Sequence, residues 1–276
     1  MKKINVSIML VSLVLIFVGP GMAEDVPQKL DKFNLQGYAD NGDKAWDVNG
    51  DHANIEGNNI DITNVDANHF GNQDINLKAK KGTIDKASGK IHLEKDVVIT
   101  SESGSTMKTD SLDWEKEKDL VSTDDLVVIT DKGMQAVGKG LTAHPGQQTA
   151  QMHNDVTVKV NTEPEKLLDG RIVTVTCDGP MEVDQAKNMA VFNDNVVAVQ
   201  SDRTLKADIM ELYFDPTTKK IKQTICIGHV VIVQGENKTY ADKAVYDGPS
   251  QKLTLTGRPK LIMLTEGEGS IGSFKQ

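Results

Sequence analysis

The chain has 276 residues, of which 4% are aromatic, and its formal net charge at pH 7 is −9. Its length allows one large β domain or two moderate domains. The acidic balance disfavours nucleic acid as a partner, because a negative surface repels phosphates and no basic stripe with interleaved aromatic residues offsets it.

The first 23 residues have the pattern of an export signal. Two lysines precede an apolar run, Ile4–Val18, and the small residues Gly21 and Ala23 occupy the positions that a signal peptidase requires. We therefore expect residues 1–23 to be a cleaved signal peptide. A retained membrane anchor is the alternative, although the run is shorter than the ~20 residues that span a bilayer. Residues 24–35 are expected to form a polar linker.

The segment from Gly37 to Asp74 is dense in Asn, Asp and Gly, with single apolar residues between them. Short strands separated by Asx and Gly turns produce this pattern. A calcium loop is a sharper interpretation of Asp66 and Asn68, but Phe70 stands where such a loop needs an oxygen ligand. We therefore predict solvated turns and no metal site here.

A unit of about thirty residues then repeats, and each copy holds a polar turn, a short strand and a β-branched strand. The residues that precede the β-branched runs are separated by steps of 29, 30, 40, 34 and 30 residues. These anchor residues are Asp96, Asp125, Asp155, Asn195, His229 and Pro259. The predicted class is all-β, built from antiparallel repeats.

The longest step between anchors contains Pro164 and a charged cluster, which marks a boundary between two modules. We expect the first module to span residues 36–164 and the second to span residues 165–265. Residues 266–276 are expected to be a disordered tail.

Apolar and polar residues alternate along the repeat strands. Val156 and Val158 point one way and Thr157 points the other, as in a sheet with one buried face and one wet face. Alignment of the repeats puts nine residues on the same apolar face: Val97, Ile99, Leu126, Val128, Val156, Val158, Val196, Val230 and Ile232. These side chains either fill a closed core between two stacked sheets or line an apolar trough long enough for acyl chains.

No motif in the sequence supports catalysis. Residues 267–272 match the dinucleotide fingerprint without its βαβ context, and residues 105–108 match S-x-x-K without its partner motifs. The six histidines are scattered singly, and the carboxylates recur at turns from repeat to repeat. We predict no catalytic residue, no metal and no cofactor.

Two cysteines, Cys177 and Cys226, would lie in an oxidising compartment after export. A disulfide is permitted there. They occupy different places within their repeats, so a pair of buried free thiols is the alternative.

Several segments together resemble the LptC family of lipopolysaccharide export proteins. They are GYADNGDKAWDV from Gly37, GTIDKASGKIHLEKDVVI from Gly82, VSTDDLVVIT from Val121 and GMQAVGKGLTA from Gly133. Residues 165–265, with LKADIMELYFD and TYADKAVYD, are similar to the related LptA/OstA-like repeat domain. The chain is longer than a single member, as if one module of each kind were joined.

The resemblance implies a twisted, open β-jellyroll whose apolar groove carries the acyl chains of lipopolysaccharide. It implies a non-enzymatic role in the periplasm, in a bridge from an inner-membrane ABC transporter toward the outer membrane. Other Lpt-type β-jellyroll proteins would join such a protein edge to edge. Two alternatives remain: a right-handed β-helix that binds or cleaves polysaccharide, and a structural envelope repeat protein with a filled interior.

Overall fold

The computed structural model describes residues 28–39, 41–71, 74–161, 172–218 and 220–263. These residues form seventeen strands in one sheet and two short 3-10 helices. The strands are β1 (Gln28–Tyr38), β2 (Lys44–Glu56), β3 (Asn59–His69), β4 (Ile75–Asp85), β5 (Lys90–Ser101), β6 (Thr106–Glu115), β7 (Leu120–Asp131), β8 (Met134–His144), β9 (Thr149–Asn161), β10 (Ile172–Cys177), β11 (Met181–Asp184), β12 (Met189–Gln200), β13 (Arg203–Phe214), β14 (Ile221–Gln234), β15 (Asn237–Asp247), β16 (Lys252–Thr256) and β17 (Lys260–Ile262). The 3-10 helices are η1 (Lys116–Lys118) and η2 (Pro145–Gln147).

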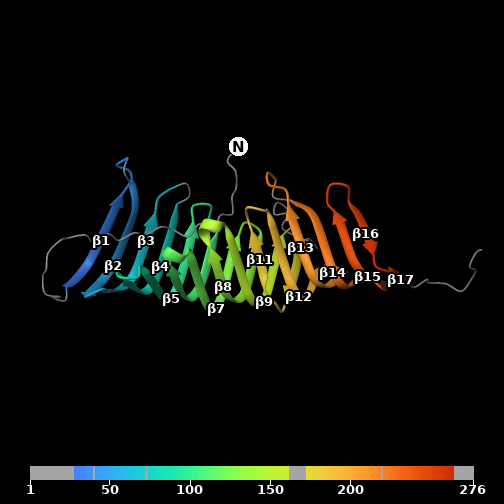
Figure 1. The fold of residues 1–276 in the computed structure, drawn as a ribbon, viewed down its shortest axis with the longest axis horizontal. Coiled ribbons are helices and arrows are strands. Elements are labelled where there is room, and N and C mark those ends of the chain that lie inside the picture. The colour runs from blue at the N-terminus through green and yellow to red at the C-terminus, as the bar shows by residue number, and fades with distance from the viewer. Residues whose placement is uncertain (1–27, 40, 72–73, 162–171, 219, 264–276) are drawn as a thin grey trace, which may run out of the picture.

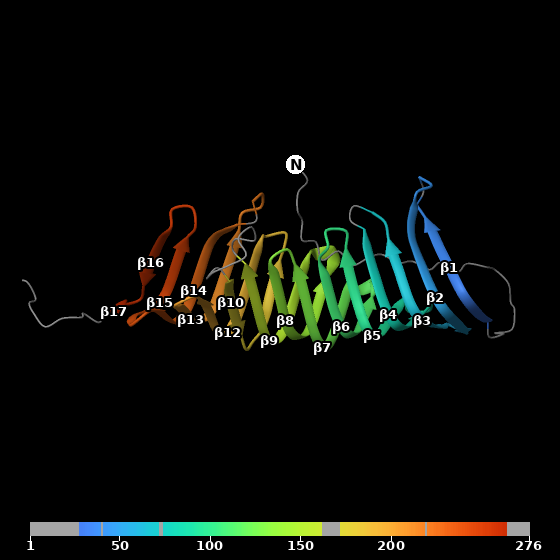
Figure 2. The same cartoon turned by 180° about the vertical axis from the view of Figure 1, so that it is seen from behind.

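The strands form an antiparallel meander. Each strand from β1 to β9 pairs with the next, and so does each strand from β12 to β15. Strands β10 and β11 share the position between β9 and β12, and β16 and β17 share the position beside β15. Figures 1 and 2 show the strands side by side along the long axis, from β1 at one end to β17 at the other.

The predicted class is therefore confirmed: the protein is all-β and antiparallel, as an open jellyroll requires. The described pairings lack the parallel rungs of a right-handed β-helix, so that alternative fails. The expected signal segment, tail and boundary between residues 164 and 165 lie outside the described residues. Within the described ranges, no helix is long and apolar enough to cross a membrane.

The linker predicted over residues 24–35 was wrong from residue 28 onward. These residues form β1, which pairs along its length with β2. Leu30, Phe33 and Leu35 are half-buried on β1, and the residues between them are exposed. β1 therefore buries one sparse apolar row, and the rest of its sequence is polar.

The Asn- and Asp-rich segment forms the long strands β2 and β3 instead of the expected short strands and turns. Its polar side chains bridge neighbouring strands. Asn34 Nδ2 donates to Asn49 Oδ1 at 2.6 Å, and Asn68 Nδ2 donates to Asp47 Oδ1 at 2.8 Å. Cross-strand hydrogen bonds of this kind stabilise a sheet, so the polar composition here supports strands.

A β-bulge recurs in alternate strands, namely β5, β7, β9, β12 and β14. In four of these strands, one residue at the bulge has a positive φ, between 42° and 56°. These residues are Asp96 on β5, Asp155 on β9, Asn195 on β12 and His229 on β14. Asn, Asp and His tolerate this region better than most residues. A bulge bends its strand, so the whole sheet bends at one level.

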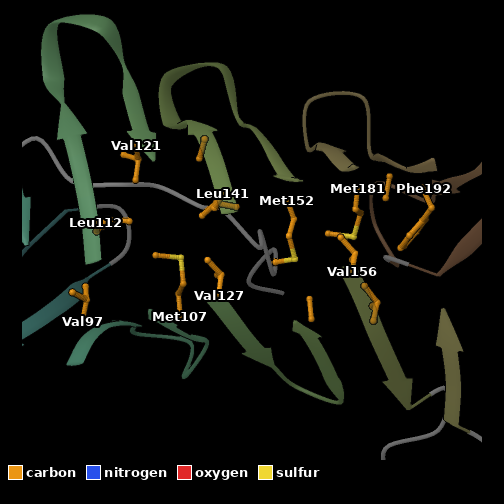
Figure 3. Close-up of a cluster of buried hydrophobic side chains, with 14 of the residues drawn as sticks. Val97, Met107, Leu112, Val121, Val127, Leu141, Met152, Val156, Met181 and Phe192 are labelled. Atoms are coloured by element: carbon orange, nitrogen blue, oxygen red, sulfur yellow. The ribbon is translucent and has the colours of Figure 1, made fainter. Parts of the chain in front are cut away.

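The bend makes the inner side chains of the two strand halves face one another. Figure 3 shows two opposed rows of buried side chains, the first of Val121, Leu141 and Met152 and the second of Val97, Met107, Val127 and Val156. The buried residues form one apolar cluster that extends from Val48 on β2 to Ala244 on β15.

The sheet and its core continue past the interval at 162–171. β9 pairs with β10, where Val156 lies opposite Cys177, and with β11, where Met152 lies opposite Met181. All four of these side chains are buried. The two expected modules therefore share one sheet and one interior.

Candidate functional site

Seven of the nine residues predicted for the apolar face do lie on the inner face of the bent sheet. Five are buried: Val97, Val156, Val158, Val196 and Val230. Ile99 and Ile232 are half-buried and pack against the same cluster. The sequence thus located this face correctly in β5, β9, β12 and β14.

Leu126 and Val128 were placed on the wrong face. Leu126 is 58% exposed, whereas Val127 is fully buried and Ile129 packs against the core. Val128 alternates with these two and faces outward. The error is a one-residue slip, which moves every side chain of a strand to the opposite face.

The slip arose from the anchor chosen for β7. In the other bulged strands the residue before the inner valine is Asp, Asn or His with a positive φ. In β7 the residue before the inner Val127 is Leu126. The repeat alignment used Asp125 as the anchor instead, which is one residue too early. A second signal identifies the true register: Met152 and Phe192 lie four residues before a buried valine, and Thr123 lies four residues before Val127.

The interior opens into an apolar pocket of about 60 Å³ near its N-terminal end. Strands β2–β6 supply its walls. The residues that line it are Val48, Ile62, Val65, Ala67, Asn68, His69, Ile75, Leu77, Gly82, Ile84, Ile91, Leu93, Ile99, Leu112 and Trp114. An apolar cavity of ~150 Å³ holds a benzene molecule. This pocket therefore admits only a short length of hydrocarbon unless the facing rows separate.

His69 brings a polar group into this apolar pocket. It is the last residue of β3, and it pairs with Trp46 on β2 and Ile75 on β4. Burial lowers the pKa of His69, and the nearby carboxylate of Asp74 opposes this effect only in part. The imidazole is therefore neutral at pH 7.

Comparison with known families decides what kind of protein has this interior. A family described as "Lipopolysaccharide-assembly, LptC-related" matches residues 21–161, which is just over half of the chain. The chain belongs to the LptC-related family. A second family, described as "LptA/(LptD N-terminal domain) LPS transport protein", matches residues 175–272. The boundary predicted between residues 164 and 165 falls in the interval between the two matches.

One solved structure similar to this LptC-related protein is LptH from Pseudomonas aeruginosa, described as the LptA homologous periplasmic component of the conserved lipopolysaccharide transport device. It is 13% identical, and the alignment covers 48% of this chain and 95% of LptH with a TM-score of 0.38. No curated protein sequence matches the chain.

The pocket belongs to the LptC-related part of this protein, residues 21–161, because all of its walls come from β2–β6. The LptA-like part, residues 175–272, contributes the inner residues Val196, Val230 and Ile232. The apolar cluster joins the two parts across β9 and β10. One apolar cluster of side chains therefore extends through both family matches.

Both cysteines lie in the LptA-like part as buried free thiols, Cys177 on β10 and Cys226 on β14. Strands β12 and β13 lie between these two strands in the sheet. These two strands are three strand spacings apart, about 14 Å across the sheet, and the two cysteines form no disulfide. Burial raises the pKa of Cys177 to about 11 and that of Cys226 to about 12.

Four of the aspartates that recur through the repeats cap turns at the ends of strands. Each accepts a backbone N–H from a residue two or three positions later; they are Asp85, Asp184, Asp215 and Asp247. Hydrogen bonds from the turn lower the pKa of all four carboxyls. Across the described ranges, no three His, Cys, Asp or Glu residues are grouped to hold a metal ion.

Proposed function

We propose that this protein is a non-enzymatic periplasmic carrier that binds the acyl chains of lipopolysaccharide along its apolar interior. It passes them from an inner-membrane ABC transporter toward the outer membrane. The observation that supports this most directly is the single apolar cluster that crosses from the LptC-related part into the LptA-like part. A filled structural repeat protein would not need to keep both lipopolysaccharide-transport family patterns in one chain.

Loading requires the facing rows to separate, because the inner valines are buried against one another. Each methylene group that leaves water for this interior contributes about 0.8 kcal/mol. Several methylenes therefore offset the contacts that two or three separated side-chain pairs lose. The sheet is open at both ends, so its halves can move apart without breaking the pairing between neighbouring strands.

The test is photo-crosslinking in cells that make lipopolysaccharide, with a photoreactive amino acid at Ile129 or Ile232. Both residues are only half-buried on the inner face, so a larger side chain is tolerated there. Val128 and Val231, each next to an inner residue on the same strand, face outward and are the matched controls. We expect lipid adducts at both inner positions and at neither control. Equal labelling of all four positions, or of none in a folded protein, contradicts the proposal.

The two ends of the sheet are the surfaces through which we propose that other Lpt-type β proteins join by strand pairing. β1 ends the sheet on one side, and β16 and β17 end it on the other (Figure 1). An unpaired strand edge presents backbone N–H and C=O groups to another chain. Replacing Leu253 and Leu261, both exposed on β16 and β17, with Lys should abolish co-purification of the outer-membrane-side partner. The matched change of exposed Val199 on β12 to Lys should leave it intact.

A further inference from the structure

A buried carboxylate joins two strands near the β1 end of the sheet (Figure 1). Asp47 on β2 is 6% exposed, and it lies opposite Asn68 on β3. Its two oxygens have different partners. Oδ2 lies 2.5 Å from Lys44 Nζ, and Oδ1 accepts a hydrogen bond of 2.8 Å from Asn68 Nδ2. One carboxylate therefore holds a primary amine and a primary amide beside each other.

The amide carbonyl of Asn68 has a hydrogen-bond donor on its oxygen. Asn76 Nδ2, on β4, donates to Asn68 Oδ1 at 2.8 Å, and the same nitrogen donates to Asp66 Oδ1 at 2.6 Å. A donor in this position stabilises the negative charge that develops on a carbonyl oxygen when a nucleophile attacks the carbon. Asn68 Cγ is thus presented as an electrophile.

Lys44 supplies the nucleophile, and Asp47 supplies the base beside it. The side chain of Lys44 is half-buried, and Nζ lies 5.3 Å from the centre of the Phe70 ring. Burial alone raises the pKa of Asp47, but the hydrogen bonds from Asn68 and Lys44 lower it by more. Asp47 is therefore a carboxylate at pH 7. In this form it can take a proton from an amine within hydrogen-bonding distance.

We propose that Lys44 and Asn68 become joined by an isopeptide bond that the folded chain forms by itself. Asp47 takes a proton from Lys44 Nζ, and the electron pair left on Nζ forms a bond to Asn68 Cγ. Asp47 passes the proton to Nδ2, the bond between Cγ and Nδ2 breaks, and ammonia leaves. A second proton passes from Nζ through Asp47 to the ammonia. The products are a secondary amide, an ammonium ion and an unchanged Asp47.

Folding is what brings the reacting groups together. Lys44 and Asn68 belong to different strands, so they meet only when β2 and β3 have paired. The bond then fastens these two strands to each other beside the terminal strand β1. A similar but more open group serves as a comparison. Lys78 Nζ lies 3.3 Å from Asp66, whose side chain is 40% exposed, so water solvates the lysine and no bond is expected there. This modification is separate from the carrier function and does not depend on it.

Mass spectrometry of the unsubstituted full chain tests the proposal. Loss of ammonia lowers the mass of the folded protein by about 17 Da. Trypsin does not cut after an acylated lysine, so residues 33–78 should appear as one peptide that is lighter by the same amount. An asparagine that cyclises on its own loses the same mass. It does so in the unfolded chain as well, however, and it leaves cleavage after Lys44 intact. Protein kept in urea should therefore retain its full mass and be cut after Lys44.

Two variants assign the roles within this group. Lys44→Arg keeps a cation beside Asp47 without a nucleophilic amine, and Asp47→Asn removes the group that carries the proton. Both should retain the full mass. The matched control Lys78→Arg changes the comparison lysine and should lose ammonia as the unsubstituted protein does.

The measurement on the unsubstituted protein does not depend on how any variant folds. Full mass in the folded chain, with complete cleavage after Lys44, overturns the inference. The same loss of ammonia in Lys44→Arg overturns it too.

Discussion

Two positions in the sheet are occupied by a strand broken in two, and they differ in burial. β10 and β11 are separated around Gly179 and Pro180, and β16 and β17 are separated around Gly257 and Pro259. β10 and β11 lie between β9 and β12, whereas the described pairings give β16 and β17 a neighbour on one side only, β15. The broken strand is thus interior in one case and terminal in the other.

The exposure of apolar side chains follows this difference. Val175 on β10 is 5% exposed, whereas Leu253 on β16 is 47% exposed and Leu261 on β17 is 60% exposed. All three are aliphatic residues in broken strands. Whether such a residue is buried depends more on a second neighbouring strand than on the local sequence. The C-terminal end of the sheet has apolar residues like those of an interior strand, but it lacks a second neighbouring strand to cover them.

The strongest test of this comparison places a charge in each broken strand. Val175→Asp should lower the free energy of unfolding by on the order of 4 kcal/mol, because the carboxylate is buried without a partner. Leu253→Asp should change it by no more than about 0.5 kcal/mol, because the side chain already faces water. Urea denaturation measures both. Equal losses would show that the C-terminal end is covered in solution.

The pairing of β9 with β10 and β11 is the joint between the LptC-related part and the LptA-like part. The reactivity of the thiols tests whether this joint is as closed to solvent as the interior of the LptA-like part. Only thiolates react, and both thiols are buried with raised pKa values, so labelling of the native protein at pH 8 should be slow at both sites. Mass spectrometry of single-cysteine variants measures the two rates. Much faster labelling of Cys177 than of Cys226 would show that the two parts separate at the joint.

The same thiols predict a loss of stability at alkaline pH. In the unfolded chain they lose their protons near pH 9, whereas in the folded chain they hold them to about pH 11 and about pH 12. The unfolded state therefore binds fewer protons above pH 9, and folding stability falls as the pH rises from there. The double variant Cys177→Ala/Cys226→Ala should lose less stability than the unsubstituted protein between about pH 8 and about pH 10. Parallel curves would contradict this.

The smallest expected effect concerns matched turns beside the two broken strands. Asp184 accepts the Lys187 N–H at 2.9 Å after β11, and Asp247 accepts the Ser250 N–H at 2.9 Å before β16. Both carboxyls have lowered pKa values, so their contribution is present above pH 3.8 and is lost as the pH falls below it. Asp184→Asn and Asp247→Asn should cost equal, small amounts of stability at pH 7, and the cost should shrink as the pH falls below 3.8. A larger loss of stability for Asp184→Asn would show that the turn after β11 also stabilises the interior strand beside it.

Much of the fold was predictable because the residue pattern within each strand indicates which of its side chains are buried. The alternation of Val156, Thr157 and Val158 identified a one-sided sheet, and the anchors Asp96, Asn195 and His229 marked the bulges. These signals are local, since they depend on the two-residue period of a strand and on residues that tolerate a positive φ.

The features that the sequence did not reveal depend on neighbours. β1 is mostly polar, and its half-buried residues are recognisable as an inner row only when β1 is paired with β2, so it was taken for a linker. In β7 the bulge position holds Leu126, which is apolar and outward, so local patterning pointed the wrong way. His69 was seen only as a solitary histidine, because its place in the wall of the apolar pocket becomes apparent only when strands β2–β6 are placed together.

The hydrogen bonds that join β9 to β10 and β11 have a consequence for assembly. Where two separate proteins meet edge to edge, the fraction joined depends on their concentrations and on equal synthesis of both. Here the partners are segments of one polypeptide, so the joint forms in a unimolecular step and persists at any dilution. A cell that makes this chain makes its two parts in equal numbers, with the joint between them already formed.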